Sequence, residues 1–296
     1  MFLRLYEVLR RKMADAVKQG ITAYHWMSVR CSRRIGVTSI KRNPELIVSL
    51  TTIPERIGRV ALCIDCLLRQ STKPDRVILW LSEAAEPGKS RVTPGGLPPD
   101  LLALQRRGLD IRWCQDIGSY RKVIPALREY PSAVVVTADD DILYPRTWLQ
   151  TLYEAYAREP QFVHCHRAHL IGYDRAGSVL PYSQWQFGAV GYVGPSPDLF
   201  PTTGGGVLYG PGQLHPEVLN ESAFLTLCPR ADDVWLMAMS VKAGMLAKKV
   251  RPKTFRIIEI RFQNNRTLWE QNSLASGNDM QIAAVANRYE VFRRRV

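Results

Sequence analysis

Three consecutive aspartates, Asp139, Asp140 and Asp141, follow two residues after an apolar, β-branched run at residues 134–136. Such a run predicts a strand that is buried on both faces of a parallel sheet. Ligands bind at the carboxyl edge of these sheets, where a hard divalent cation can neutralise adjacent acids. In an extended chain, Asp139 and Asp141 would project to one side and Asp140 to the other. The run indicates either a metal site or a solvated acidic turn that caps a helix starting near Tyr144.

A second pair of acids, Asp232 and Asp233, opens a stretch with helical periodicity. Helix capping explains one aspartate at such a position, because its side chain accepts from free backbone N–H groups. Capping explains a pair less well. A carboxylate at a helix N-terminus on a sheet edge can act as a general base if it reaches a substrate hydroxyl directly or through one water.

Three glycines, Gly204, Gly205 and Gly206, precede an apolar Val-Leu-Tyr segment. Without a Cβ, a ligand can approach the backbone N–H groups. The spacing is not that of a Walker or dinucleotide-binding loop. The run predicts a ligand-facing turn, or else a bulge without a ligand. Upstream of it, Trp185 is either a platform for a sugar ring or part of the core.

The elements that must position these residues alternate between strand and helix. Apolar runs predict strands at 46–50, 76–82, 109–114 and 134–137, and helices at 57–70 and 119–127. This alternation is typical of α/β proteins, in which helices flank a mostly parallel sheet. Past residue 156, short strands and Gly/Pro turns fit the mixed part of such a sheet. We expect one domain at 46–296, in two halves at about 46–145 and about 146–296.

Residues 1–45 form a basic segment. They hold ten Lys and Arg against three acids, a net +7 of the chain's +13. Apolar and basic residues alternate there at helical spacing, which suits either an amphipathic helix on an anionic membrane or a helix packed on the domain. A nucleic-acid-binding arm is less favoured, because no binding motif accompanies the charge. We expect an N-terminal extension and no nucleic-acid partner.

Two targeting features are missing from the sequence. No run in the 296 residues is long and apolar enough for a membrane span, and the first residues do not resemble a secretory signal. The expected location is cytoplasmic, with peripheral attachment to the inner face of the cytoplasmic membrane if the basic helix binds lipid.

Several runs together resemble one enzyme family. The run from Thr137 to Pro145 (TADDDILYP) looks like the Asp-x-Asp signature of GT-A glycosyltransferases, and Asp232-Asp233-Val looks like the Glu-Asp motif of their inverting members. The runs TTIPER from Thr51 and TGGGVLY from Thr203 resemble bacterial surface-polysaccharide transferases of capsule, O-antigen and lipopolysaccharide. The resemblance implies a GT-A-like, Rossmann-like fold for a catalytic domain at 46–296, with a nucleotide half at about 46–145 and an acceptor half at about 146–296.

The resemblance also assigns roles. It places a nucleotide and its diphosphate near Thr51, Thr52, Arg56, Lys122, Asp139 and Asp140. It implies Mn²⁺ or Mg²⁺ on Asp139 and Asp141, and donor sugar and acceptor beside Gly204, Gly205, Gly206 and Trp185. Asp233 becomes the base, with Asp232 in place of the family's Glu. Many members add a C-terminal His to the metal site; this chain has none after His215, and Asp279 is the expected substitute.

The predicted function is therefore metal-dependent transfer of a sugar, with inversion, from a nucleotide-diphosphate sugar such as a UDP-sugar. The acceptor would be a hydroxyl of a glycan or of a lipid-linked glycan. One rival is a nucleotidyltransferase that uses the same aspartates. The other is a non-catalytic basic module that binds membranes or polyanions.

Overall fold

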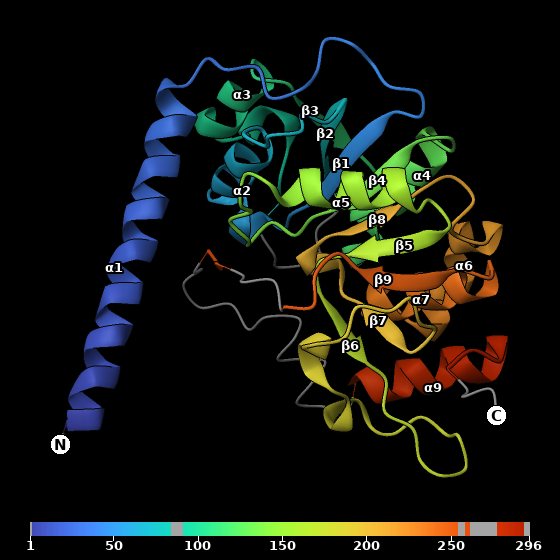
Figure 1. Cartoon of the computed structure of the whole chain (residues 1–296). Helices are drawn as coiled ribbons and strands as arrows, with labels where there is room; N and C mark the ends of the chain where they lie inside the picture. The colour runs from blue at the N-terminus through green and yellow to red at the C-terminus, as the bar shows by residue number, and fades with distance from the viewer. Residues whose placement is uncertain (1, 84–90, 254–257, 261–276, 293–296) are drawn as a thin grey trace.

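The computed structural model describes residues 2–83, 91–253, 258–260 and 277–292 (Figure 1). Within these ranges, a seven-stranded sheet has the order β3-β2-β1-β4-β8-β5-β9. Its strands are β1 (Leu46–Thr51), β2 (Arg76–Leu81), β3 (Leu109–Trp113), β4 (Val134–Thr137), β5 (Phe162–Cys165), β8 (Val207–Tyr209) and β9 (Leu246–Lys249). Strand β8 is antiparallel to β4 and β5, and the other pairs are parallel. A separate antiparallel pair is formed by β6 (Ala168–Leu170) and β7 (Leu199–Pro201).

The sheet is buried on both faces, as the apolar runs predict. Along β1, Leu46, Val48 and Leu50 join one core cluster while Ile47 joins another on the opposite face. This is the two-residue periodicity of a strand whose successive side chains point to opposite sides. The predicted α/β class, with a mixed and mostly parallel sheet between helices, is confirmed.

Helices cover both faces (Figure 1). They are α1 (Phe2–Cys31), α2 (Val60–Leu67), α3 (Pro99–Gln105), α4 (Ile124–Glu129), α5 (Trp148–Arg158), α6 (Glu221–Leu227), α7 (Asp232–Lys242) and α9 (Gly277–Tyr289). The helix expected at 57–70 is shorter, because residues 57–59 form a turn that links the 3₁₀ segment Pro54–Arg56 to α2 and residues 68–69 form a turn after it. The helix expected at 119–127 is likewise divided into a 3₁₀ segment, Gly118–Lys122, and α4. None of the described helices is long and apolar enough to cross a membrane.

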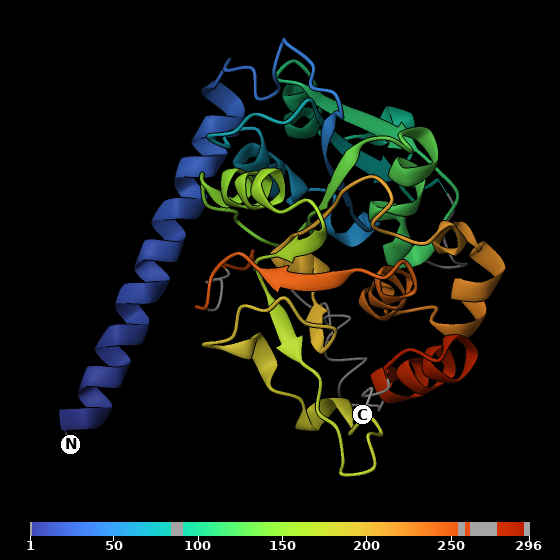
Figure 2. The ribbon, with the colours of Figure 1, turned by 45° about the vertical axis from the view of Figure 1, so that its right-hand side comes forward.

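Helix α1 has a packed half and a projecting half. Ile21, Trp26 and Val29 pack on the core that contains α2 and α3. The projecting half stands apart from the body in both ribbon views (Figures 1 and 2). Its exposed side chains include Tyr6, Met13 and Val17. We expected the N-terminal extension to end at residue 45. The packed half of α1 lies before that boundary but contributes side chains to the domain's core.

A buried carboxylate on α2 anchors the packed half of α1. Asp65 is fully buried, and its oxygens lie 2.6 Å from His25 Nδ1, 2.9 Å from Ser28 Oγ and 2.6 Å from Arg107 NH1. Burial raises the pKa of Asp65, but its bonds with His25 and Arg107 outweigh burial and hold the pKa below the ordinary value. Removing one partner of such a buried pair is strongly destabilising, since a charge is left uncompensated. The anchor therefore fixes α1 to the body.

Candidate active site

The first site residue, Asp139, follows β4 at the carboxyl edge of the sheet, beside β1. Ser49 of β1 pairs with Thr137 of β4, so the chain segments after both strands emerge together. Lys122, at the end of the Gly118–Lys122 turn, places Nζ 2.8 Å from Asp139 Oδ1. Burial raises the pKa of Asp139, but the charge and hydrogen bond of Lys122 outweigh it and hold the pKa below its ordinary value. Asp139 is therefore ionised at neutral pH.

The other two aspartates lie in a turn rather than in an extended strand. Asp140 is buried and accepts hydrogen bonds from Thr52 Oγ1 at 2.5 Å and Arg56 NH1 at 2.9 Å. The same Arg56 nitrogen lies 3.0 Å from Asp141 Oδ2. The strict alternation expected for an extended chain is therefore wrong, because the chain leaves β4 at Thr137. Asp139 and Asp141 are nevertheless the two partly exposed members, with 34 % and 27 % of their side chains accessible.

Crowding of carboxylates affects Asp141 most. Burial and the neighbouring charges of Asp139 and Asp140 raise its pKa to about 7. Burial also raises the pKa of Asp140 against the opposing charge of Arg56. Carboxylates held this close together repel one another, and a cation relieves that repulsion. The negative charge of the three carboxylates is therefore not fully neutralised by the cationic side chains around them.

The glycine run lies directly against these acids. Residues Thr203–Gly205 form a 3₁₀ turn. A Cβ on Gly204 would lie 2.4 Å from Asp139 Oδ2, and one on Gly206 would lie 2.5 Å from Trp148 Nε1. Gly206 also has a φ of 103°, which disfavours any other residue. The glycines are thus needed for close approach of the turn to Asp139.

Asp232 and Asp233 reach the same turn from the start of α7. Thr203 N donates to Asp233 Oδ1 at 2.8 Å, and Lys122 Nζ lies 3.1 Å from Asp232 Oδ2. The residue preceding the helix is Ala231, and no side chain caps this end. Burial and the charge of Asp232 raise the pKa of Asp233 to about 6. The structure therefore brings the predicted metal acids and the predicted base together around Lys122 and Thr203.

Three predicted residues lie outside this group. Thr51 uses its hydroxyl to donate to Trp80 O at 2.8 Å. Trp185 is only 3 % exposed and packs in the core with Phe200, so it is not a sugar platform, and its core alternative is the one observed. Asp279, on α9, accepts from Tyr182 N at 2.7 Å.

The residues present fit a divalent cation held by Asp139 and Asp141. Both are partly accessible oxygen donors, and Asp141 carries a raised pKa that a cation would lower. Among the described residues, no three His, Cys, Asp or Glu side chains are gathered as one metal-holding group. Asp279 therefore does not complete a protein-only site here. The remaining ligands of such an ion would come from a diphosphate and water.

Comparisons with known proteins give only remote likenesses to solved structures. No protein-family model and no curated protein matches the chain. Among solved structures, one similar chain is a mannosyltransferase from Pyrobaculum calidifontis, in complex with GDP-Man and Mn²⁺: identity is 16 %, the TM-score 0.47, and the match covers 93 % of this chain and 74 % of that one. Another is a 4-diphosphocytidyl-2C-methyl-D-erythritol synthase, with 10 % identity, a TM-score of 0.42 and coverage of 81 % and 99 %.

Sequence reasoning missed several residues of the site. Tyr144 OH accepts from Asp139 N at 2.8 Å and donates to Gly204 O at 2.9 Å, which ties the acid to the glycine turn. Arg167, between β5 and β6, donates to Thr202 Oγ1 at 2.6 Å, and its charge helps to lower the pKa of Asp139. Arg167 is within the HCHRAH run at residues 164–169, and no motif in the sequence marked it as a site residue.

Glu259 is another neighbour that the sequence did not indicate. It forms an isolated antiparallel bridge with Ile142, and Ile260 N donates to Asp141 O at 2.6 Å. The charge of Glu259 contributes to the raised pKa of Asp141. A pairing between segments more than a hundred residues apart leaves no local sequence signal.

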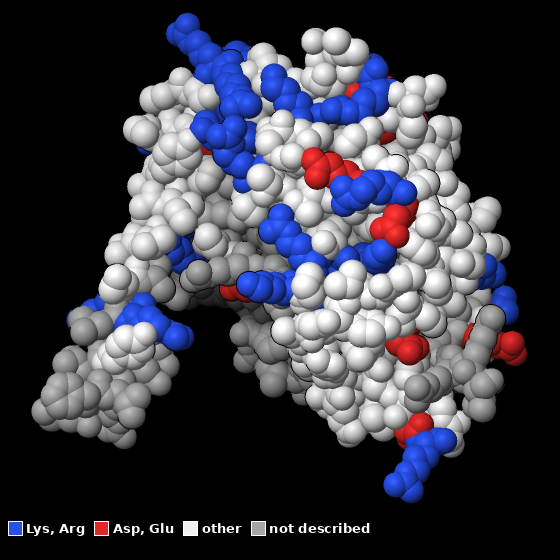
Figure 3. Space-filling model, viewed as in Figure 1, with Lys and Arg blue, Asp and Glu red and all other residues white. Residues whose placement is uncertain are grey.

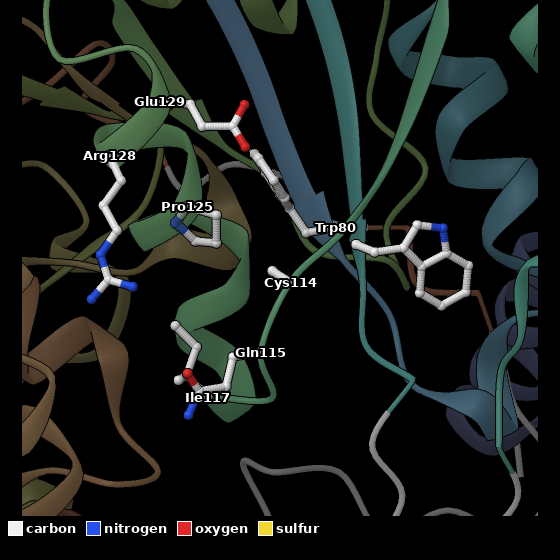
Figure 4. A pocket seen from close by; sticks show the side chains of 8 residues that line it. Trp80, Cys114, Gln115, Ile117, Pro125, Arg128 and Glu129 are labelled. Atoms are coloured by element: carbon white, nitrogen blue, oxygen red, sulfur yellow. The ribbon is translucent and has the colours of Figure 1, made fainter.

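Two hollows lie beyond the ends of β2 and β3. The smaller, of about 170 Å³, lies between α4 and the segment after β3, where Trp80 and Cys114 face Pro125, Arg128 and Glu129 (Figure 4). The larger, of about 400 Å³, is lined by Ser82, Glu83, Trp113, Cys114, Gln115 and Asp116. Its volume is within the roughly 300–1,000 Å³ of small-molecule sites. The site aspartates at 139–141 and 232–233 line neither hollow, but the larger one lies at the same sheet edge.

Proposed function

We propose that the chain is a metal-dependent glycosyltransferase that moves a sugar from a nucleotide-diphosphate sugar, such as a UDP-sugar, to an acceptor hydroxyl. The observation that carries the proposal is that Lys122 contacts both Asp139 and Asp232. Two acidic groups with different chemical environments therefore meet at one sheet edge. The pKa of Asp139 is lowered and that of Asp233, next to Asp232, is raised to about 6, and such a difference suits separate roles.

Asp139 and Asp141 would hold Mn²⁺ or Mg²⁺ on the donor side. A bound divalent cation neutralises the diphosphate as it leaves. Arg56, which already bridges Asp140 and Asp141, orients this part of the cluster. Asp140 is buried and serves to hold Arg56 and Thr52, so it is a supporting residue rather than a ligand.

Asp233 would act as the general base on the acceptor side. With a pKa of about 6, Asp233 is mostly ionised at pH 7. Its pKa is also near enough to that pH for the carboxylate to accept a proton in the reaction. The acceptor oxygen forms a bond with the anomeric carbon, the bond from that carbon to the diphosphate oxygen breaks, and the hydroxyl proton passes to Asp233. Attack opposite the leaving group inverts the anomeric configuration. Thr203 N keeps one carboxylate oxygen in place.

The nucleoside would occupy the larger hollow at the ends of β2 and β3. Trp113 there supplies an aromatic face on which a base can stack, and Glu83 and Asp116 supply acceptors for ribose or base N–H and O–H groups. This places the nucleoside on the β2–β3 side of the aspartates.

A peripheral position on an anionic membrane accompanies this function, with a lipid-linked glycan as the acceptor. Tyr6, Met13 and Val17 are 65 %, 70 % and 62 % exposed, and at 100° per residue they lie on one face of α1. Arg10 and Lys12 are exposed on the same projecting half. Elsewhere, Lys and Arg side chains spread over the face drawn in Figure 3. An apolar stripe beside basic residues suits insertion at an anionic interface.

Product analysis with a panel of nucleotide sugars and Mn²⁺ tests the proposal. Release of nucleoside diphosphate, together with a glycoside of inverted configuration, is the expected result. In a parallel assay with nucleoside triphosphates and a sugar 1-phosphate, release of pyrophosphate would instead identify the nucleotidyltransferase. Absence of both turnover and nucleotide binding would favour the non-catalytic module. A panel that includes uridine and guanosine donors also identifies the base.

A further inference from the structure

Lys122 has its ammonium group held by three oxygen atoms of the protein. Its Nζ donates hydrogen bonds to Asp139 Oδ1 at 2.8 Å and to Thr203 Oγ1 at 2.7 Å, and it forms an ion pair with Asp232 Oδ2 at 3.1 Å. The side chain is 8 % exposed. Two carboxylates, one from each group of acids, therefore share the positive charge of Lys122.

The three partners of Lys122 differ in whether another group could take its place if the ammonium group moved away. Asp232 is only 9 % exposed, and Thr203 Oγ1 lies 3.4 Å from its Oδ2. Leaving Asp232 would strand a buried carboxylate, which is strongly unfavourable. Asp139 is 34 % exposed and faces the side where a cation would bind. The contact with Asp139 is therefore the one that can be exchanged.

We propose that Lys122 is an exchangeable counter-ion of the site, an inference that rests on the proposed function. In the metal-free protein, its ammonium group neutralises Asp139. When a divalent cation binds Asp139 and Asp141, Lys122 gives up Asp139 and remains on Asp232 and Thr203. Lys122 is thus a positioning residue that competes with the cation.

The exchange reaches the base through Thr203. The hydroxyl of Thr203 accepts from Lys122 and donates toward Asp232, while its backbone amide donates to Asp233. A shift of the ammonium group toward Asp232 therefore changes the surroundings of Asp233. Occupation of the donor side is in this way communicated to the acceptor side without any movement of a strand or helix.

Titration of Mn²⁺ into the nucleotide-free protein, followed by electron paramagnetic resonance of the free ion at pH 8, tests the competition. Lys122→Met should bind Mn²⁺ about tenfold more tightly than the wild type, because a positive charge has left the site. Lys122→Arg keeps the charge and should stay near the wild type. Lys242→Met loses the same charge on α7, beside Glu217, and should be unchanged. Weaker or unchanged binding by Lys122→Met would overturn the inference.

A measurement on the wild type covers the case in which Lys122→Met does not fold. Mg²⁺ should shift the ¹⁵Nζ signal of Lys122, while that of Lys249, whose Nζ donates to the carbonyls of Gly188 and Ala189, should not move. An unmoved Lys122 signal in a protein that binds Mg²⁺ would refute the exchange alone. A wild-type protein that binds no Mn²⁺, even with UDP or GDP, would instead refute the proposed function.

Discussion

The backbone nitrogen of Thr203 lies 2.8 Å from Asp233 Oδ1 and donates a hydrogen bond to it. The same threonine begins the glycine turn that presses on Asp139. One short segment therefore positions a carboxylate from α7 relative to a carboxylate from β4. The first two predictions follow from this connection.

Replacing Asp233 with Asn should lower kcat by about 10²-fold or more while nucleotide affinity is kept, because an amide cannot accept the acceptor's proton. In the wild type, kcat/KM should fall as pH drops through the pKa of about 6, where the carboxylate becomes protonated. Initial rates from pH 5 to 8, with nucleotide affinity by calorimetry, check both statements. A retained anomeric configuration in the product would contradict the role of Asp233.

Replacing Gly204 with Ala should abolish most activity and leave the fold intact. The new Cβ would lie 2.4 Å from Asp139 Oδ2, and that carboxylate can rotate away at little cost to stability. Gly206→Ala should instead lower the melting temperature, because it meets the buried Trp148 ring at a φ of 103°. Gly58→Ala, which meets no atom within 4 Å, is the control. Full activity in Gly204→Ala would show that activity does not depend on this position of the Asp139 carboxylate.

Replacing Asp141 with Asn should weaken UDP binding only when Mn²⁺ or Mg²⁺ is present, since a lost carboxylate weakens a hard-cation site. Activity should fall by orders of magnitude. Calorimetric titration of UDP with and without metal measures the difference. Equal affinity in the mutant and the wild type under both conditions would remove Asp141 from the metal site.

The same Asp141→Asn variant should be more stable than the wild type at pH 8 in a chelator. The folded-state pKa of about 7, against 3.8 ordinarily, means that the folded protein holds this proton more tightly than the unfolded chain does. The contribution of Asp141 to stability therefore falls as pH rises from about 4 to 7. Removing the charge should recover roughly 1–3 kcal/mol at pH 8 and little at pH 4. Denaturant unfolding at both pH values measures this.

Deleting residues 1–18 should release the protein from anionic vesicles without lowering its melting temperature, because this part of α1 stands off from the body. Deleting residues 1–40 should destabilise the protein, because it also removes His25, Ser28 and Val29 from their buried contacts. Co-sedimentation with anionic and neutral vesicles, at low and high salt, provides the measurement. Equal binding to neutral vesicles would contradict an electrostatic contribution.

Much of the fold was predictable from local pattern. Apolar runs ended by acids or prolines gave β1 and β4 nearly to the residue, and they placed Asp139 at the sheet edge. Helix α3 was not anticipated, because its seven residues lie beside a Pro/Gly-rich stretch that reads as a loop.

The site was predictable in part. The run after β4 indicated the acids, but it could not show that the chain turns after Thr137 and that Arg56 then bridges Asp140 and Asp141. Contacts between distant segments, such as Lys122 with Asp232, depend on the tertiary fold and carry no local signal. Trp185 shows that the sequence can also suggest a role that the fold excludes. A tryptophan can stack on a sugar at the surface, but the side chain of Trp185 is buried.

The contacts of Asp65 fix the packed end of α1 and so determine how far the rest of this helix projects. From Ile21 back to Phe2, an uninterrupted helix advances about 30 Å at 1.5 Å per residue. His25 and Ser28 of this helix bond to Asp65, which Arg107 also contacts, so the packed end of the helix is fixed. The projecting part therefore cannot reorient as a flexible segment would. On a bilayer it would act as a rigid support that limits the tilt of the whole protein. Acceptors would then be selected by how far their sugar end extends from the lipid, as well as by the shape of the site.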